Sequence, residues 1–171
     1  RFMPLLRAAR GRIVNTSSVM AWLVGPGFGA YCASKAALSA ASRAWRYELA
    51  ADGVAVSVLE PGITRTALWP KLEAQLEVHH ARLNGRRPLP ADAARYSPMV
   101  RRIRASNGLA PAFALPTRHA VAAALHALTS RYPKATYRVG WDARLLSLAT
   151  WVASDEVVEW ACRAIGIVSE S

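Results

Sequence analysis

The 171-residue sequence contains little cysteine and no long apolar run. Its two cysteines, Cys32 and Cys162, lie 130 positions apart, which excludes a disulfide framework and a C-x-x-C metal clip. The histidines do not occur at metal-ligand spacing either, so we expect no metal site. The longest nearly apolar run, residues 145–153, is about half as long as a membrane-spanning helix requires. The first residues, with an early proline and arginine, do not resemble a secretory signal. We therefore expect a cytoplasmic protein, and peripheral membrane association stays open.

Acidic residues are scarce as well. Eleven Asp and Glu residues oppose 22 Lys and Arg residues, which gives a net charge of +11. Much of this excess lies in residues 82–118, where eight arginines accompany a single acidic residue, Asp92. This window raises the alternative of a nucleic-acid or anionic-membrane binder. It contains no interleaved series of aromatic residues and no recognisable nucleic-acid module, so we interpret it as a solvated, partly irregular segment and expect no nucleic-acid partner.

The first half of the chain has the pattern of a strand, a helix and a second strand. Residues 12–17 are rich in β-branched side chains and predict a strand. Residues 30–51 are dense in Ala and Leu without Gly or Pro, and Gly53 supplies a stop, so we expect a helix there. Residues 54–59 are almost continuously apolar, as in a strand that is covered on both faces, and Pro61-Gly62 ends it. A crossover of this length predicts two parallel strands.

The second half predicts further helices and one more strand. We expect an amphipathic helix over residues 68–82, an irregular segment over 83–115, and a helix over 117–130 with Thr117 as its cap. Residues 136–139 predict a short strand, and residues 142–168 have a helical, apolar pattern. The composition, 53% hydrophobic, suits one domain with a real core. The fold class is therefore α/β.

Tyr31 and Lys35 carry the first sign of chemistry. They are four residues apart, so their side chains lie on one face of the predicted helix. An ammonium beside a phenol favours the phenolate form, which makes the tyrosine a usable proton donor and acceptor. An isolated pair of this kind is a weak signal. The same face continues with four residues that we expect to pack on the sheet: Leu38, Ala41, Trp45 and Leu49.

Polar and turn residues follow both predicted strands. Ser17 and Ser18 lie just past the first strand, and Pro61-Gly62 lies at the end of the second. The carboxyl ends of parallel strands share one edge, where ligands bind in open α/β sheets. The helix with Tyr31 and Lys35 begins on this side, so serine, tyrosine and lysine are expected to converge on one crevice.

Three segments together resemble the second half of the short-chain dehydrogenase/reductase family. They are GRIVNTSS at 11–18, YCASKAAL at 31–38 and EPGITRT at 60–66. Residues 127–133 and 137–146 resemble the retinol and hydroxysteroid dehydrogenase branch of that family. The resemblance implies the C-terminal part of a Rossmann-type doubly wound parallel sheet that lacks the N-terminal dinucleotide-binding strands.

The resemblance also implies roles for individual residues. Tyr31 is the expected general acid/base, and Ser18, thirteen positions before it, is the expected catalytic serine that positions the substrate oxygen. Lys35 is expected to hold the ribose hydroxyls of NAD or NADP and to assist Tyr31. The cofactor-binding residues implied by the resemblance are Tyr31, Lys35, Pro61, Gly62, Ile63 and Thr66.

The resemblance implies one partial domain over residues 1–171. Residues 1–66 form its catalytic unit, 67–115 its substrate lid, and 116–171 the last helix, last strand and tail.

The implied substrate is a small lipophilic alcohol or carbonyl compound, and the implied partner is a second copy packed on the helix that carries Tyr31. We expect this piece to be inactive on its own. The alternative is a non-catalytic remnant that serves as a binding or dimerisation module. Within the lid, five residues are as compatible with ordinary core as with an apolar pocket: Leu68, Trp69, Leu72, Met99 and Phe113.

Overall fold

The computed structural model describes residues 2–24, 28–67, 71, 114–154, 156, 157 and 160. In these ranges it contains a parallel sheet with the strand order β1-β2-β3, formed by Arg12–Thr16, Ala55–Pro61 and Thr136–Val139. Ile13 pairs with Val56 and Leu59 pairs with Tyr137. Because all three strands run in the same direction, their carboxyl ends meet at one edge of the sheet.

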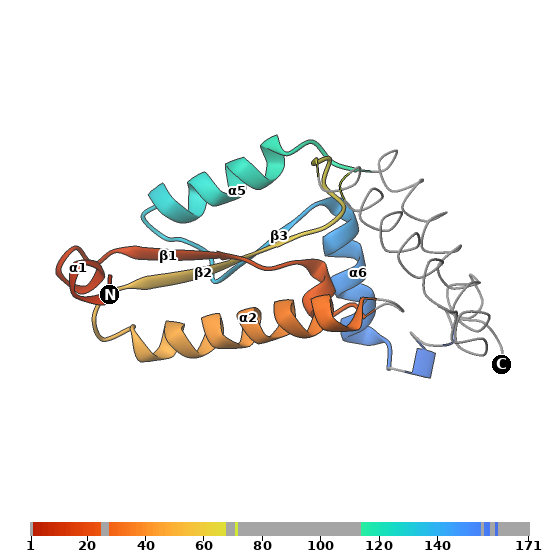
Figure 1. Ribbon diagram of the computed structural model, residues 1–171, viewed down its shortest axis with the longest axis horizontal. Helices are drawn as coiled ribbons and strands as arrows, with labels where there is room; N and C mark the ends of the chain where they lie inside the picture. The colour runs from red at the N-terminus through yellow and green to blue at the C-terminus, as the bar shows by residue number, and fades with distance from the viewer. Residues whose placement is uncertain are drawn as a thin grey trace, which may run out of the picture.

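Helices cover both faces of this sheet (Figure 1). Helix α1 (Met3–Ala8) precedes β1, and helix α2 (Gly29–Glu48) follows it after the 3-10 turn η1 (Val19–Ala21). Helix α2 lies on one face and α5 (Arg118–Thr129) on the other, and α6 (Trp141–Val152) follows β3 at the carboxyl edge. The arrangement confirms the predicted α/β class and the parallel βαβ unit.

The core is built around the central strand β2. Leu59 packs with Ala127, Tyr137 and Val139 under α5. On the other face, Val54 and Val56 pack with Leu49 near α1. Strand β2 is buried at its five central positions, as its nearly continuous apolar pattern predicts for a strand covered on both sides.

Helix α2 presents a more polar face to the sheet than we predicted. Trp45 is 40% exposed, whereas Ser39 and Ser42 are buried. The expected stripe through Trp45 is therefore wrong at that position. Small serine side chains let the helix approach the strands closely, and their hydroxyls are paired, since Ser42 Oγ donates to the Leu38 carbonyl and accepts from Asn15 Nδ2.

Replacing Ser42 with alanine is expected to lower the free energy of unfolding by about 1–3 kcal/mol, because the partly buried Asn15 amide loses its acceptor. Denaturant unfolding of the whole protein that carries this chain measures the change. Ser34→Ala on the same helix is the control, since the Ser34 side chain is exposed and the substitution is expected to change stability by less than about 0.5 kcal/mol. Equal stabilities of the two variants would contradict this account of the α2 face.

Several predicted boundaries need correction. Helix α2 ends at Glu48 rather than near residue 51, although Gly53 has the positive φ of +72° that its proposed stop requires. Strand β2 continues through Pro61 instead of ending at residue 59. Thr117 precedes α5, but its side chain makes no capping hydrogen bond, because its backbone is already helical. The predicted helix at 68–82, the lid residues and most of the arginine-rich window lie outside the described residues.

Membrane-spanning helices and metal-binding clusters are absent from the described residues. No helix there combines the length and the apolar character needed to traverse a bilayer. Nor do three or more His, Cys, Asp or Glu side chains in those ranges gather closely enough to hold a metal ion. Cys32 is buried at 4% exposure.

Candidate functional site

Lys35 lies near the start of α2 and faces the carboxyl end of β1. Its Nζ donates a hydrogen bond of 3.1 Å to the Thr16 carbonyl, the last residue of that strand. The same Nζ lies 5.7 Å from the centre of the Tyr31 ring. The four-residue spacing thus brings the two side chains together as the sequence predicts. With one donor directed at Thr16, the three-donor ammonium retains capacity for another acceptor.

The serines after β1 attach this strand end to its neighbours. The Ser17 N–H donates to the Leu59 carbonyl of β2 at 2.8 Å. Ser17 Oγ donates to the backbone carbonyl of Lys35 at 3.0 Å and accepts from Ser39 Oγ at 2.8 Å. These hydrogen bonds are partly or fully buried. They fix the position of the start of α2 relative to the edge of the sheet.

Ser18 has a different environment from Ser17. It is buried at 9% exposure, and its Oγ accepts a hydrogen bond of 3.2 Å from the Met20 N–H at the start of η1. This contact caps the turn and uses the oxygen as an acceptor, so the hydroxyl proton is available for donation to another group. Ser18 thus has a structural function in addition to any chemical one.

Tyr31 is accessible from solvent. Its side chain lies in the first turn of α2 and is 41% exposed, while Cys32 beside it is buried. A group that exchanges protons with a bound molecule has to be reachable in this way. The arrangement of phenol, ammonium and serine hydroxyl at one sheet edge is suited to proton transfer and to hydrogen bonding of a polyhydroxyl ligand.

The segment after β2 forms the adjoining part of this edge. The Gly62 N–H donates to the Val139 carbonyl at 2.9 Å, and the Ile63 N–H donates to Asp142 Oδ2 at 2.7 Å. Beyond them, the Thr64–Leu115 bridge secures the segment, with the Leu115 N–H donating to the Ile63 carbonyl. Pro61, Gly62 and Ile63 are half-buried and Thr66 is exposed. The structure places the segment at the predicted edge, and its contact with a cofactor stays a prediction.

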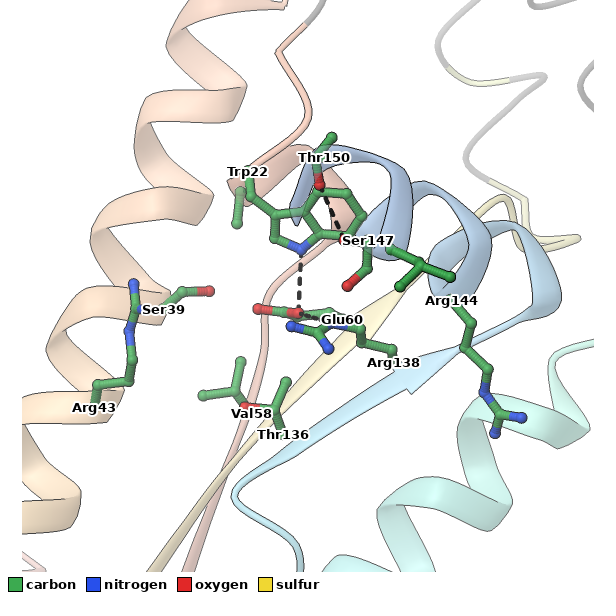
Figure 2. Close-up of a pocket in the computed structure, with 12 residues that line it drawn as sticks. Trp22, Ser39, Arg43, Val58, Glu60, Thr136, Arg138, Arg144, Ser147 and Thr150 are labelled. Carbon is green, nitrogen blue, oxygen red and sulfur yellow. Dashed lines mark hydrogen bonds and ion pairs between the residues drawn. The ribbon is translucent and has the colours of Figure 1, made fainter. Parts of the chain in front are cut away.

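A separate cavity lies on the α2 face of the sheet. It has a volume of about 820 Å³ and is bordered by α2, α6 and the strands β2 and β3. Within it, Figure 2 shows the Trp22 indole directed at Glu60, to which it donates at 3.1 Å, while Arg138 pairs with the same carboxylate at 3.7 Å. None of Ser18, Tyr31 and Lys35 lines this cavity.

Sequence reasoning missed Glu60 and Asp142 as site-forming residues. Glu60 is 7% exposed, and in the sequence it appears only as the first residue of the EPGITRT segment. Asp142 meets Ile63 across 79 positions of sequence. Local patterns do not signal such distant pairs, although an acidic residue in the first turn of a helix is a weak indication of a backbone contact.

Comparison with known proteins shows what the chain is similar to. Residues 1–77 match the family model for short chain dehydrogenase. Retinol dehydrogenase 5 of Mus musculus is 38% identical over 167 residues, which cover 92% of this chain and 51% of that protein. The Homo sapiens retinol dehydrogenase 5 is 36% identical over the same shares of the two chains. Over residues 1–77 the chain is similar to the short-chain dehydrogenase/reductase family. Over most of its length it is similar to the retinol dehydrogenases.

A solved structure supports the fold. A short chain dehydrogenase from Burkholderia cenocepacia J2315, crystallised in complex with NADP, superimposes with a TM-score of 0.59 at 22% identity. The match covers 94% of this chain and 50% of that one. The present chain thus spans about half the length of the relatives that it matches. The superposition confirms that its strands and helices form part of a Rossmann-type fold.

Proposed function

We propose that the protein carrying this chain is an NAD(P)-dependent oxidoreductase that interconverts an alcohol and a carbonyl group on a lipophilic substrate. The observation that carries the proposal is the contact of Lys35 with both Thr16 and Tyr31 at the carboxyl edge of the sheet. Ligands bind at this edge in open α/β folds. The similarity to retinol dehydrogenases favours a retinoid-like substrate, with steroid-like or acyl-like molecules as further members of the class.

The residues present fit a nicotinamide cofactor. A lysine ammonium with spare donor capacity suits the two ribose hydroxyls, and Tyr31 is close enough to share them. Pro61, Gly62, Ile63 and Thr66 lie on the neighbouring strand end and would border the nicotinamide ring and its amide. The cofactor, when bound, supplies or accepts the hydride.

The side chains of this chain then handle the proton and the oxygen. In the direction of carbonyl reduction, Tyr31 donates its hydroxyl proton to the substrate oxygen as negative charge develops there, and Ser18 donates a hydrogen bond to the same oxygen. Lys35 stabilises the resulting phenolate by its positive charge. In alcohol oxidation each of these steps runs in reverse.

We also propose a homo-oligomer in which α2 contributes to the contact between copies. Trp45 and Tyr47 on this helix are 40% and 79% exposed, and aromatic residues of this kind are enriched in subunit interfaces. The alternative function, a binding or dimerisation module without catalysis, shares this surface but needs neither Ser18 nor Tyr31.

Replacing Ser18 with alanine tests the proposed chemistry. We expect kcat for carbonyl reduction by the whole protein to fall on the order of 10²-fold, because one preorganised donor to the developing oxyanion is lost. Ser130→Ala is a matched control, since Ser130 Oγ also accepts a bond of 3.2 Å from an N–H two residues ahead, at Tyr132. The control removes the same kind of turn contact far from the site and is expected to retain kcat. Equal activities of both variants would refute the role of Ser18.

A further inference from the structure

Asp142 joins the start of α6 to the segment that follows β2. It is the second residue of α6. This helix begins directly after Gly140, which follows the last residue of β3. Its Oδ2 accepts the hydrogen bond of 2.7 Å from the Ile63 N–H. A single side chain thus connects the carboxyl ends of two neighbouring strands at the edge where Lys35 and Tyr31 lie.

Two glycines make room for this carboxylate. A methyl group on Gly62 would overlap both oxygens of Asp142, and one on Gly140 would overlap Oδ1. Gly140 also has a positive φ of +117°, which side chains rarely adopt. The Gly62 backbone, the Gly140 backbone and the Asp142 carboxylate therefore fit as a set, and a larger residue at either glycine would displace the carboxylate.

The carboxylate is held there at an energetic cost. Asp142 Oδ1 is buried and, among the described residues, has no hydrogen-bond partner. A buried unpaired oxygen lowers stability. What the arrangement gains is the charge-assisted bond to Ile63, since an ionised acceptor binds a backbone N–H more strongly than a neutral one. The bond fixes the backbone of the segment that is proposed to border the cofactor.

We propose that Asp142 is a positioning residue that holds Pro61, Gly62 and Ile63 in the conformation that receives the nicotinamide end of the cofactor. The inference rests on the proposed function for its consequence in catalysis. Its structural part, restraint of the Ile63 amide, does not. Asp142 acts through the Ile63 backbone and does not itself exchange a proton or hydride with the substrate.

The test compares Asp142→Ala and Asp142→Asn in the whole protein that carries this chain. Amide hydrogen exchange at Ile63 is measured without added cofactor. We expect exchange to accelerate at least about tenfold in Asp142→Ala, because the acceptor is gone. In Asp142→Asn we expect a change within about threefold, because an amide oxygen can still accept the bond. Asp52→Ala is the control, since Asp52 accepts from the Arg7 side chain at 2.8 Å instead of from this segment.

Steady-state kinetics supply the second readout. Asp142→Ala is expected to raise the KM for NAD(P)H about tenfold and to lower kcat at saturating cofactor by a smaller factor, because the misplaced segment weakens cofactor binding first. Asp142→Asn should restore KM to within about threefold of the wild type. A structural role alone would lower the amount of folded protein without this division between KM and kcat.

The outcomes separate the two proposals. Unchanged Ile63 exchange in Asp142→Ala, as in Asp52→Ala, overturns the role of Asp142 whatever the activity. If Asp142→Ala does not fold, Gly140→Ala decides, because its methyl group displaces the carboxylate, and unchanged Ile63 exchange in that variant overturns the role. Accelerated Ile63 exchange in a protein without any NAD(P)-dependent activity would instead refute the proposed function while upholding the positioning of this segment.

Discussion

Replacing Tyr31 with phenylalanine is expected to lower kcat for carbonyl reduction by about 10²- to 10⁴-fold in the whole protein that carries this chain. Phenylalanine keeps the aromatic ring but cannot donate a proton to the substrate oxygen. The side chain is 41% exposed, so the loss of the hydroxyl leaves no buried polar partner behind. We therefore expect the fold and the affinity for NAD(P)H to change little.

Tyr132→Phe is the matched control for this substitution. Tyr132 is 76% exposed and lies beyond the end of α5, outside the proposed site. Its variant should keep the wild-type kcat and melting temperature. A Tyr31→Phe enzyme with more than a third of the wild-type kcat would contradict the role assigned to Tyr31, and it would favour the alternative of a non-catalytic module.

Local sequence patterns predicted much of the fold. Strand β3 covers Thr136–Val139 as expected, because a β-branched and aromatic run between turn residues leaves few alternatives. The long α2 and the parallel pairing of β1 with β2 also follow from apolar patterning and crossover length. These features depend on neighbouring residues, which a single sequence displays directly.

The face that a helix buries was harder to predict. The apolar periodicity of α2 predicts that Trp45 packs against the sheet, whereas Ser39 and Ser42 are the residues that the helix buries there. A serine is tolerated in the core only when its hydroxyl group is hydrogen-bonded. The Ser42 hydroxyl is hydrogen-bonded to Asn15, which lies on a strand 27 positions away in the sequence. Since such partners come from other elements, the hydrophobic pattern of the helix alone cannot reveal them.

In the candidate site, too, local sequence patterns predict some features and not others. Tyr31 and Lys35 were predictable because they are four residues apart on one helix. Ser18 was predictable because it follows a strand and lies thirteen positions before Tyr31, the spacing that the family resemblance implies. The contact of Asp142 with Ile63 and that of Trp22 with Glu60 join elements that are distant in sequence. Their identification required the three-dimensional arrangement of the strand ends.

In the proposed function, the carboxyl edge of this sheet serves hydride transfer between a nicotinamide cofactor and a lipophilic carbonyl compound. Isotope tracing tests it most directly. The whole protein is incubated with NADH or NADPH that carries deuterium at both C4 positions, together with retinaldehyde or a steroid ketone, and the alcohol product is analysed by mass spectrometry. The former carbonyl carbon receives the hydride, and the oxygen receives a proton by way of Tyr31.

We predict an alcohol with one deuterium on the former carbonyl carbon, formed at least about 10²-fold more slowly by Tyr31→Phe than by the wild type and at an unchanged rate by Tyr132→Phe. An alcohol without deuterium, or no alcohol from either carbonyl substrate with either cofactor, would contradict the account.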